Sequence, residues 1–291
     1  MDSITLKSPA KLNLFLDVLH KRPDGYHDIE TIFERIDLCD EIVLTKADKG
    51  INIACGNKDV PTDRTNLIHK AIKSLSVHLK KDINVNIILK KKIPVAAGLG
   101  GGSANAAAAL IGINRLFDLG LTNTQLMPLA EKIGADVPFF LLDEPFALGR
   151  GKGEDLEVLR TDLVLWHVIV RINLKISTKD IYSALDLGLT AHKPDVKIIH
   201  NSIINKDIAA ISKQLYNRLE DVVFEKHREI SDLKAVLKDS GLGKGVLLSG
   251  SGPAIFCITD NRQEAVGLKD RLASLAPFKK ADYQVFVAKT L

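Results

Sequence analysis

Apolar and polar residues alternate over several short stretches of the chain, as they do in half-buried strands. The clearest case is residues 83–89, where apolar side chains recur at every second position with Asn84 and Asn86 between them. A repeat of two places these side chains on one face of a strand. Further strands are predicted over residues 29–36, 41–45 and 51–55. Residues 4–19 are also rich in apolar side chains, but Pro9 interrupts them and predicts a strand, a bulge and a second strand.

Two other segments have helical spacing. Residues 66–81 carry apolar side chains three and four positions apart with lysines between them, which predicts an amphipathic helix. A second helix is expected to begin near Thr122, because Thr122 and Gln125 have the spacing of a capping box. Both helices lie in the first half of the chain.

The second half has a different pattern. Short strands are predicted on both sides of residues 149–153, and residues 163–172 form a strongly apolar strand. Residues 246–248 and 254–259, a helix near 262–275 and a strand over 283–288 complete a β-β-α-β tail. Strands and helices mix without regular βαβ alternation, so the sequence predicts an α+β protein with two lobes. The boundary is expected near residue 160, giving domains 1–160 and 161–291.

The most informative segment is a glycine-rich stretch followed by an alanine-rich one. Four of the five residues from Gly98 to Gly102 are glycine, and the alanine-rich residues 106–110 that follow are strong helix formers. Glycine lets the backbone take positive φ and approach a ligand without a Cβ in the way. The helix that follows would present unpaired N–H groups and the positive end of its dipole. This arrangement predicts a phosphate-binding loop.

Two common phosphate loops do not match this segment. The dinucleotide fingerprint counted from Gly98 requires glycine where the chain has Ser103, and the Walker A pattern requires a lysine that is missing after Gly102. A tight turn with close packing is the simpler alternative. Turns seldom need so many glycines directly ahead of a helix, so phosphate binding is favoured.

Composition and charge exclude several classes of protein. The 291 residues are 46% hydrophobic and 26% charged, as in ordinary globular proteins, and 40 basic residues against 36 acidic ones give a net charge of +4. The basic residues form no long block of the kind that nucleic-acid tails carry. The mild positive charge suits an anionic small-molecule substrate without identifying one. We expect a small-molecule substrate, with no nucleic acid and no membrane as partner.

Cysteines and the N-terminal sequence indicate the compartment. Cys39, Cys55 and Cys257 are odd in number and far apart, which argues against a disulfide framework or a structural zinc site. The first residues lack the charged-then-apolar pattern of a signal peptide. The longest apolar run, 163–172, is too short to span a bilayer and contains His167. We expect a cytoplasmic protein that is a monomer or a homodimer.

Two further segments contain polar residues that could take part in chemistry. Lys11 and Asn13 lie two positions apart and so on one face of a predicted strand, where they could form one wall of a cleft. Asp136 stands among small and apolar residues, and a buried carboxylate needs a cationic or hydrogen-bonding partner. From these residues alone, a solvated strand face and a structural turn aspartate remain the simpler interpretations.

Taken together, four separated motifs resemble those of the GHMP kinases, the family of galactokinase, homoserine kinase, mevalonate kinase and phosphomevalonate kinase. Residues 94–105 resemble the second motif of this family, and residues 248–254, Leu-Ser-Gly-Ser-Gly-Pro-Ala, resemble its third. Residues 9–14 and 22–27 are most similar to one branch, which acts on a cytidine-diphosphate-linked methylerythritol in non-mevalonate isoprenoid (terpenoid) precursor synthesis. The resemblance covers nearly the whole chain.

The resemblance implies a fold, a reaction and its substrates. The fold would have an N-terminal lobe like ribosomal protein S5 domain 2, a C-terminal ferredoxin-like lobe and an active site in the cleft between them. The first lobe would be the N-terminal GHMP kinase domain, which binds ATP, and the second would be the C-terminal GHMP kinase domain. ATP, with Mg²⁺, would phosphorylate the 2-hydroxyl of the methylerythritol unit. Asp136 would accept the hydroxyl proton or orient the hydroxyl, and Lys11 would contact both Asp136 and the transferring phosphoryl group.

The resemblance also implies binding residues. The ATP-binding residues would be Asn66, Pro94, Gly98, Leu99, Gly100, Gly101, Gly102, Ser103, Gly250, Ser251 and Gly252, with Mg²⁺ held mainly through the ATP phosphates and Ser103 as a candidate ligand. The acceptor-binding residues would be Asn13, Tyr26, His27, Gly149, Thr178 and Tyr182, with aromatic rings stacked on the cytosine. Family members often have Gly-Ser-Ser-Asp where this chain has Gly-Ser-Ala-Asn, so Ala104 and Asn105 receive no role.

Two alternatives stay open at this point. Another kinase of the same family, acting on homoserine or a mevalonate derivative, would share the phosphate loop but would have no need for Tyr26, His27 and Tyr182. A non-enzymatic RNA-binding protein would fit the calculated pI of about 8.8. It would require a clustered basic face with exposed aromatic residues, and it would leave Asp136 unexplained.

Overall fold

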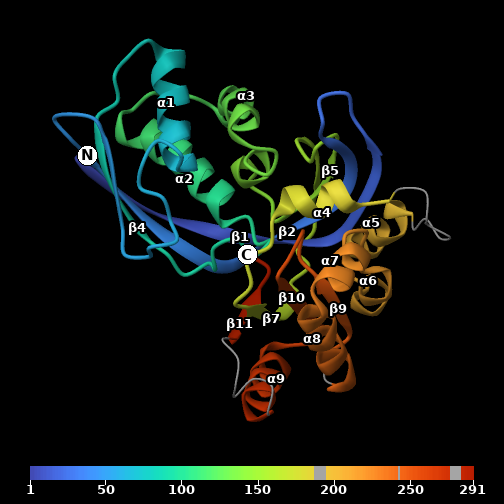
Figure 1. Cartoon of the computed structure of the whole chain (residues 1–291). Coiled ribbons are helices and arrows are strands. Elements are labelled where there is room, and N and C mark those ends of the chain that lie inside the picture. Colours follow the sequence, from blue (N-terminus) through green and yellow to red (C-terminus); the bar gives the residue numbers. More distant parts are fainter. Residues whose placement is uncertain (187–194, 242, 276–282) are drawn as a thin grey trace. The chain divides into compact units, whose positions relative to one another are not determined.

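The computed structural model describes residues 1–186, 195–241, 243–275 and 283–291 (Figure 1). Residue contacts divide the chain into two units that interleave along the sequence. Unit 1 consists of Met1–Ala10, Leu38–Val95 and Gly100–Asp143, and unit 2 consists of Lys11–Asp37, Ala96–Leu99 and Glu144–Leu291. Two long strands, β1 (Ser3–Lys21) and β2 (His27–Lys46), contribute residues to both units. The expected boundary near residue 160 stays a prediction.

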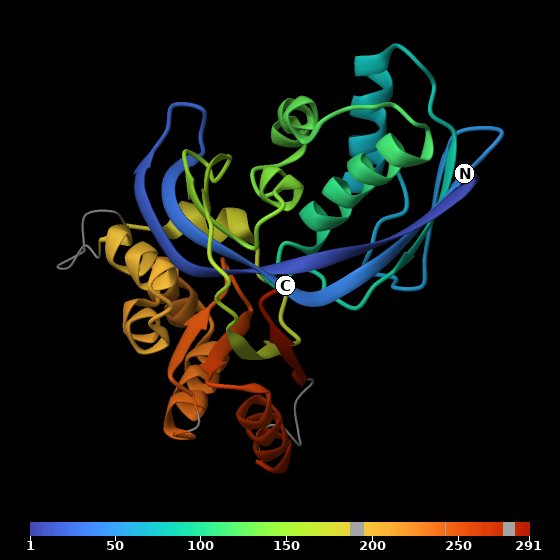
Figure 2. The same cartoon turned by 180° about the vertical axis from the view of Figure 1, so that it is seen from behind.

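Unit 1 is a sheet covered by helices on one face. The strands run in the order β3 (Ile51–Cys55), β4 (Val85–Lys90), β2 and β1, with β3 parallel and β2 antiparallel to β4. The helices are α1 (Leu67–Leu79), α2 (Gly101–Leu116), α3 (Asn123–Ile133) and the 3-10 helix η1 (Pro138–Leu141). Figures 1 and 2 show α1 and α2 together on one side of these strands.

The local sequence explains these elements. Residues of β4 alternate between buried and exposed, as the repeat of two predicts. The buried residues of α1 recur at helical spacing, from Ile68 to Leu75. The capping box of α3 is confirmed, because the side chain of Thr122 accepts from Gln125 N and the side chain of Gln125 accepts from Thr122 N.

Unit 2 contains a second sheet, which is antiparallel and has the order β11 (Tyr283–Lys289), β7 (Trp166–Ile172), β10 (Ala254–Thr259) and β9 (Gly245–Leu248). Helices α8 (Arg228–Asp239) and α9 (Arg262–Ser274) pack against it. Alternate residues of β7, namely Val168, Val170 and Ile172, share one core with leucines of both helices. The predicted β-β-α-β tail is confirmed.

The remaining elements of unit 2 join the long strands. β5 (Phe146–Arg150) pairs with β2 and with β6 (Asp155–Leu159), and β8 (Tyr216–Asn217) runs parallel to β1. The described helices between β7 and α8 are α4 (Thr178–Ala184), α5 (Val196–Ile204), α6 (Ile208–Gln214) and α7 (Glu220–Lys226). The α+β class is confirmed. Within the described ranges, no helix has both the length and the apolar character needed to cross a membrane.

Three predicted strand limits were wrong. β1 continues through Pro9 without a break, since proline is tolerated in a strand where its position needs no N–H donor. β2 is one strand rather than two, because the polar interruption at Asp40 is buried and fully hydrogen-bonded. β7 begins at Trp166 rather than at residue 163. Leu165, just before it, instead exchanges two hydrogen bonds with Thr290.

A buried polar cluster ties the C-terminal residues to β2. Glu34 Oε1 accepts hydrogen bonds from Thr290 Oγ1 at 2.6 Å and from His167 Nε2 at 2.9 Å. Glu34 and His167 are both fully buried. These residues come from β2, β7 and the segment after β11, so the cluster joins parts of unit 2 that lie far apart in the sequence.

Candidate functional site

Lys11 and Asn13 lie on the same face of β1, as predicted, and both are buried, with 4% and 2% of their surface exposed. The hydroxyl of Thr31 donates to Phe15 O at 2.7 Å and accepts from Asn13 Nδ2 at 2.8 Å. This chain of bonds orients the Asn13 amide so that its oxygen accepts from Lys11 Nζ. The segment is therefore not a solvated strand face. A buried ammonium held in a fixed place is suited to an anionic ligand.

The first glycine segment meets the third motif directly at Gly98. Gly98 has φ +77°, and a Cβ at this position would overlap Ser249 O. Ser249 Oγ donates to Gly98 O at 3.0 Å, and Ala254 N donates to Ala97 O at 3.3 Å. Only glycine permits this approach. Two segments that are 150 residues apart are thus clasped backbone to backbone.

The same clasp reaches β1 and α4. Lys11 N donates to Leu99 O at 3.0 Å, which fixes the glycine segment beside the buried lysine. Gly250, with φ +55°, would place a Cβ 3.5 Å from Asn13 Oδ1. Ser251 shares a hydrogen bond of 2.7 Å with Thr178 at the start of α4. The structure therefore brings together predicted residues from four separate segments of unit 2.

In unit 1, the glycine segment opens helix α2. The N-cap is Gly100, with φ +66°, and no side chain caps the helix. The first backbone N–H groups of α2, from Gly101 to Ser103, are therefore available to an acceptor at the positive end of the helix dipole. Ser103 lies in the first turn and is half-buried. This part fits a phosphate group without any side-chain cation.

Asp40 and Lys91, which the sequence analysis missed, hold the residues directly before the glycine segment. Asp40 is buried, accepts from the N–H groups of Lys92 and Ile93 at 2.7 and 2.9 Å, and pairs with Lys91 Nζ at 2.5 Å. Asn105 Nδ2 also donates to Asp40, at 2.9 Å. A Cβ on Gly101 would lie 3.0 Å from Lys91 Nζ. Asp40 thus joins β2, the chain before the glycines and helix α2.

The other predicted residues of unit 1 are placed by local structure. Asn66 is the N-cap of α1: its Oδ1 accepts from Ile68 N at 2.8 Å, and its Nδ2 donates to Pro61 O at 2.6 Å. Asp136 is half-buried in the turn between α3 and η1, and η1 contacts α2. Pro94 lies between β4 and α2, ahead of the glycines. The functional roles of these three residues stay predictions.

The predicted aromatic residues of the acceptor site separate into two groups. His27, at the start of β2, contacts Tyr182 of α4, with ring centroids 5.3 Å apart and planes inclined by 38°. Burial, with a smaller contribution from the charge of Lys21, lowers the pKa of His27. A neutral imidazole offers both a donor and an acceptor to a ligand. Tyr26 is 59% exposed, and Lys152 Nζ lies 5.1 Å from its ring centroid.

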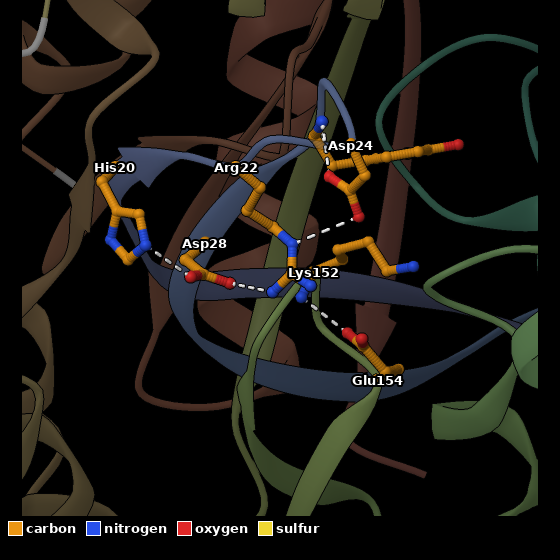
Figure 3. Close-up of polar contacts among 7 residues, drawn as sticks. His20, Arg22, Asp24, Asp28, Lys152 and Glu154 are labelled. Carbon is orange, nitrogen blue, oxygen red and sulfur yellow. Dashed lines mark hydrogen bonds and ion pairs between the residues drawn. The ribbon is translucent and has the colours of Figure 1, made fainter.

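A network of charged residues surrounds the turn between β1 and β2, immediately before His27 (Figure 3). Arg22 bonds to Asp28 at 2.6 Å and to Asp24 at 3.3 Å. Asp24 Oδ1 accepts from Tyr26 N at 3.1 Å, and this bond is the main reason that the pKa of Asp24 is lowered. His20 also pairs with Asp28, at 2.7 Å. The sequence analysis assigned no individual role to these charged residues, although residues 22–27 carried part of the resemblance.

Gly149 of β5 is opposite Thr31 of β2. A Cβ here would lie 2.8 Å from the ring of Phe33 and 3.2 Å from Thr31, so glycine allows close packing beneath the residues that orient Asn13. Its predicted contact with the acceptor stays a prediction. Among the described residues, no group of three His, Cys, Asp or Glu side chains could hold a metal ion.

Comparisons with known proteins agree with this geometry. The model for the GHMP kinases N terminal domain matches residues 66–144, and the model for the GHMP kinases C terminal domain matches residues 199–277. The chain belongs to the GHMP kinase family. This GHMP kinase is also similar, along nearly its whole length, to several relatives that share a single name.

These relatives are each named 4-diphosphocytidyl-2-C-methyl-D-erythritol kinase. The protein from Exiguobacterium sibiricum is 41% identical over 93% of this chain and 94% of its own length. That from Clostridioides difficile is 41% identical over 94% of this chain and 92% of its own length. The Acetivibrio thermocellus protein is 37% identical over the full length of both chains.

Solved structures confirm the GHMP kinase fold. A crystal structure of 4-(cytidine 5'-diphospho)-2C-methyl-D-erythritol kinase matches with a TM-score of 0.81 and 29% identity, covering 98% of this chain and 99% of its own. Homoserine kinase from Cytophaga hutchinsonii matches with a TM-score of 0.82, covering 100% of this chain and 95% of its own, but with 22% identity. The second likeness shows the fold alone.

Proposed function

We propose that this GHMP kinase transfers the terminal phosphoryl group of ATP to the 2-hydroxyl of 4-diphosphocytidyl-2-C-methyl-D-erythritol. The observation that carries the proposal is the clasp of Gly98 against Ser249 beside the buried Lys11–Asn13 pair. It occurs in a chain about 41% identical to relatives named for this reaction. The reaction places the protein in isoprenoid precursor synthesis, as its resemblance to that branch implies.

The glycine segments supply the donor side. GHMP kinases use ATP, and the uncapped start of α2 offers backbone N–H groups to its phosphates. Gly250, Ser251 and Gly252 form the second segment, in which two glycines have positive φ. Phosphoryl transfer needs little covalent chemistry from the protein, so fixed backbone donors and charges are the main requirement. Mg²⁺ would be held through the ATP phosphates, with Ser103 as a candidate ligand, and would offset their charge.

His27 and Tyr182 supply the acceptor side. Their rings form a small aromatic surface, and the neutral imidazole can exchange hydrogen bonds with the edge of a nucleobase. Such a site discriminates strongly against acceptors without the base, because its polar groups would then be left unpaired. Asn13 and Thr178 are proposed to contact the acceptor, because they border the second glycine segment.

Lys11 and Asp136 are the proposed catalytic pair. A buried ammonium favours the ionised form of a nearby carboxylate and stabilises charge on a transferring phosphoryl group. Asp136 would orient the acceptor hydroxyl and take its proton. The burial of Lys11 and its bond to Asn13 support a fixed position for the ammonium group.

Release of ADP from the purified protein with Mg-ATP tests the proposal. The acceptors compared are the cytidylated methylerythritol, mevalonate and homoserine, with a sample lacking any acceptor as control. Product with the first acceptor only is the expected result. Faster turnover with mevalonate or homoserine would move the protein to another branch of the family. Light scattering in the same buffer distinguishes a monomer from a homodimer, and the predicted cytoplasmic location can be tested by cell fractionation.

A further inference from the structure

Asn217, on the short strand β8, contacts the second glycine segment, and the sequence analysis gave it no role. Its Nδ2 donates to Leu248 O at 2.8 Å and to Gly250 O at 2.7 Å. Its Oδ1 accepts from Leu219 N at 2.9 Å. The side chain is buried, with 4% of its surface exposed. One amide therefore holds the last residue of β9 and a residue two positions further on.

The chemistry of the amide matches this task closely. A primary amide has two N–H donors on one nitrogen and an oxygen that accepts, and here each donor has a backbone carbonyl and the oxygen has a backbone N–H. A carboxylate of the same shape would keep the bond from Leu219 N but would face two carbonyl oxygens with no proton to give. The position thus requires donation as well as size.

Glu220, three residues later, bonds to the backbone N–H of the same residue, Leu248. Its Oε1 accepts from Leu248 N at 2.9 Å, and its Oε2 pairs with Lys234 Nζ at 2.5 Å. Both polar groups of Leu248 are therefore used by this pair of side chains. Asn217 is itself fixed, because β8 pairs with β1 and Arg218 N donates to Leu16 O at 2.8 Å.

We propose that Asn217 is a positioning residue for residues 248–252, holding this segment in the shape that receives the ATP phosphates. The segment joins two antiparallel strands and has no helix to order its N–H groups. One backbone bond, from Gly252 N to Ser249 O at 2.9 Å, closes its turn, and side chains from other elements supply the rest of its support. Asn217 acts through this backbone and is not expected to touch the reacting atoms. The inference rests on the proposed function, in which this segment is part of the donor site.

Asn217→Asp tests this role against a matched control. Asn114 of α2 has a similar bonding pattern elsewhere, since its side chain donates to Leu121 O and accepts from Leu121 N. Asn114 is half-buried, so Asn114→Asp removes a partly buried donor without touching the second glycine segment. We expect Asn217→Asp to lower kcat/KM for ATP by about tenfold or more, the worth of one or two lost hydrogen bonds. The KM for the acceptor should stay within about twofold, and Asn114→Asp should change neither value at a similar Tm.

Amide hydrogen exchange provides an arm that needs no activity. In the protein without nucleotide, Asn217→Asp should speed exchange in residues 248–252, while Asn114→Asp should not. Asn217→Ala gives the same readout without an added charge if the Asp variant fails to fold. Equal kinetic losses in both Asp variants, or unchanged exchange in this segment, would overturn the inference. If the wild-type protein releases no ADP with any acceptor, the proposed function fails, and exchange alone still decides whether Asn217 holds the segment.

Discussion

The two glycine-rich segments of this protein are both proposed to bind ATP phosphates, but different parts of the structure hold them in place. Residues 98–103 lead into the 16-residue helix α2, whose first N–H groups have no side-chain cap. Residues 249–253 connect the antiparallel strands β9 and β10, and no helix follows them. The first segment is ordered by the helix it begins. The second is ordered by side chains from other elements, namely Asn217, Glu220 and Thr178.

This difference indicates at which positions a single substitution would disturb the site. A helix supplies aligned N–H groups from its own backbone, so few particular side chains near α2 are needed to order them. The strand connection has backbone bonds of its own, such as that from Gly252 N to Ser249 O at 2.9 Å, but its remaining bonds come from side chains that a single substitution can remove. Gly98 is the position at which both segments depend on each other, because its carbonyl accepts from Ser249.

The largest effect is expected from substitution of the proposed catalytic pair, which should lower turnover while the two glycine segments still bind ATP. Asp136→Asn, or Lys11→Ala, should lower turnover by about 10² to 10⁴, the usual worth of a positioned acid–base group or charge. Binding of a non-hydrolysable ATP analogue should stay within a few-fold, because neither substitution alters the glycine segments. Calorimetric titration and ADP release measure the two quantities. Near-normal turnover in either variant would contradict the proposed catalytic pair.

The next effect tests the junction between the segments. In Gly98→Ala the new methyl group would overlap Ser249 O, in addition to the strain of alanine at φ +77°. Gly250→Ala is the matched control, since it has a similar φ but its nearest neighbour lies 3.4 Å away. Urea unfolding should show a loss of about 1 to 2 kcal/mol for Gly250→Ala and a clearly larger one for Gly98→Ala, which adds overlap with backbone. Equal losses would mean that the two segments are not held together at Gly98.

A smaller effect concerns the acceptor side alone. His27→Ala removes the ring that contacts Tyr182 and the polar groups proposed to meet the nucleobase. The KM for the cytidylated acceptor should rise by about tenfold, as for one or two lost hydrogen bonds, while the KM for ATP remains unchanged. Steady-state kinetics with each substrate varied in turn provides the measurement. An unchanged acceptor KM would exclude His27 from the acceptor site.

The smallest effect is a pH dependence. Burial lowers the pKa of His27, so the unfolded chain takes up this proton at a higher pH than the folded protein does. The free energy of unfolding should therefore fall as the pH drops from the ordinary histidine value through the lowered one, and His27→Gln should remove this part of the slope. NMR titration of the ring should give a midpoint below that of an unstructured histidine. A midpoint above it would show that His27 is stabilised as a cation.

Local sequence patterns predicted unit 1 well and much of unit 2 poorly. The repeat of two in β4, the helical spacing of α1 and the capping box of α3 are short-range signals, and all three are confirmed. Helices α4 to α7 are only seven to nine residues long, so their periodicity is too short to detect. Helix α8 could have been found, because Ile230, Leu233 and Leu237 recur at helical spacing.

The site shows the same division. Glycine segments and motif residues such as Lys11 stand out in sequence because of their local composition or resemblance. Asp40 and Asn217 do not, because their importance comes from the backbone groups that they contact 52 and 31 residues further along the chain. One signal was present for Asn105, an amide within the alanine-rich first part of α2, and the structure buries it against Ser8 and Asp40. Long-range polar contacts of this kind require the fold itself.

The bond from Thr290 to Glu34 has a consequence for how such a chain is made. During synthesis, Glu34 is made 133 residues before His167 and 256 residues before Thr290, so its two partners become available at very different times. Contacts of such long sequence separation slow folding. Until these contacts form, the carboxylate of Glu34 lacks the hydrogen bonds that compensate its burial. This favours late packing of the interior around Glu34.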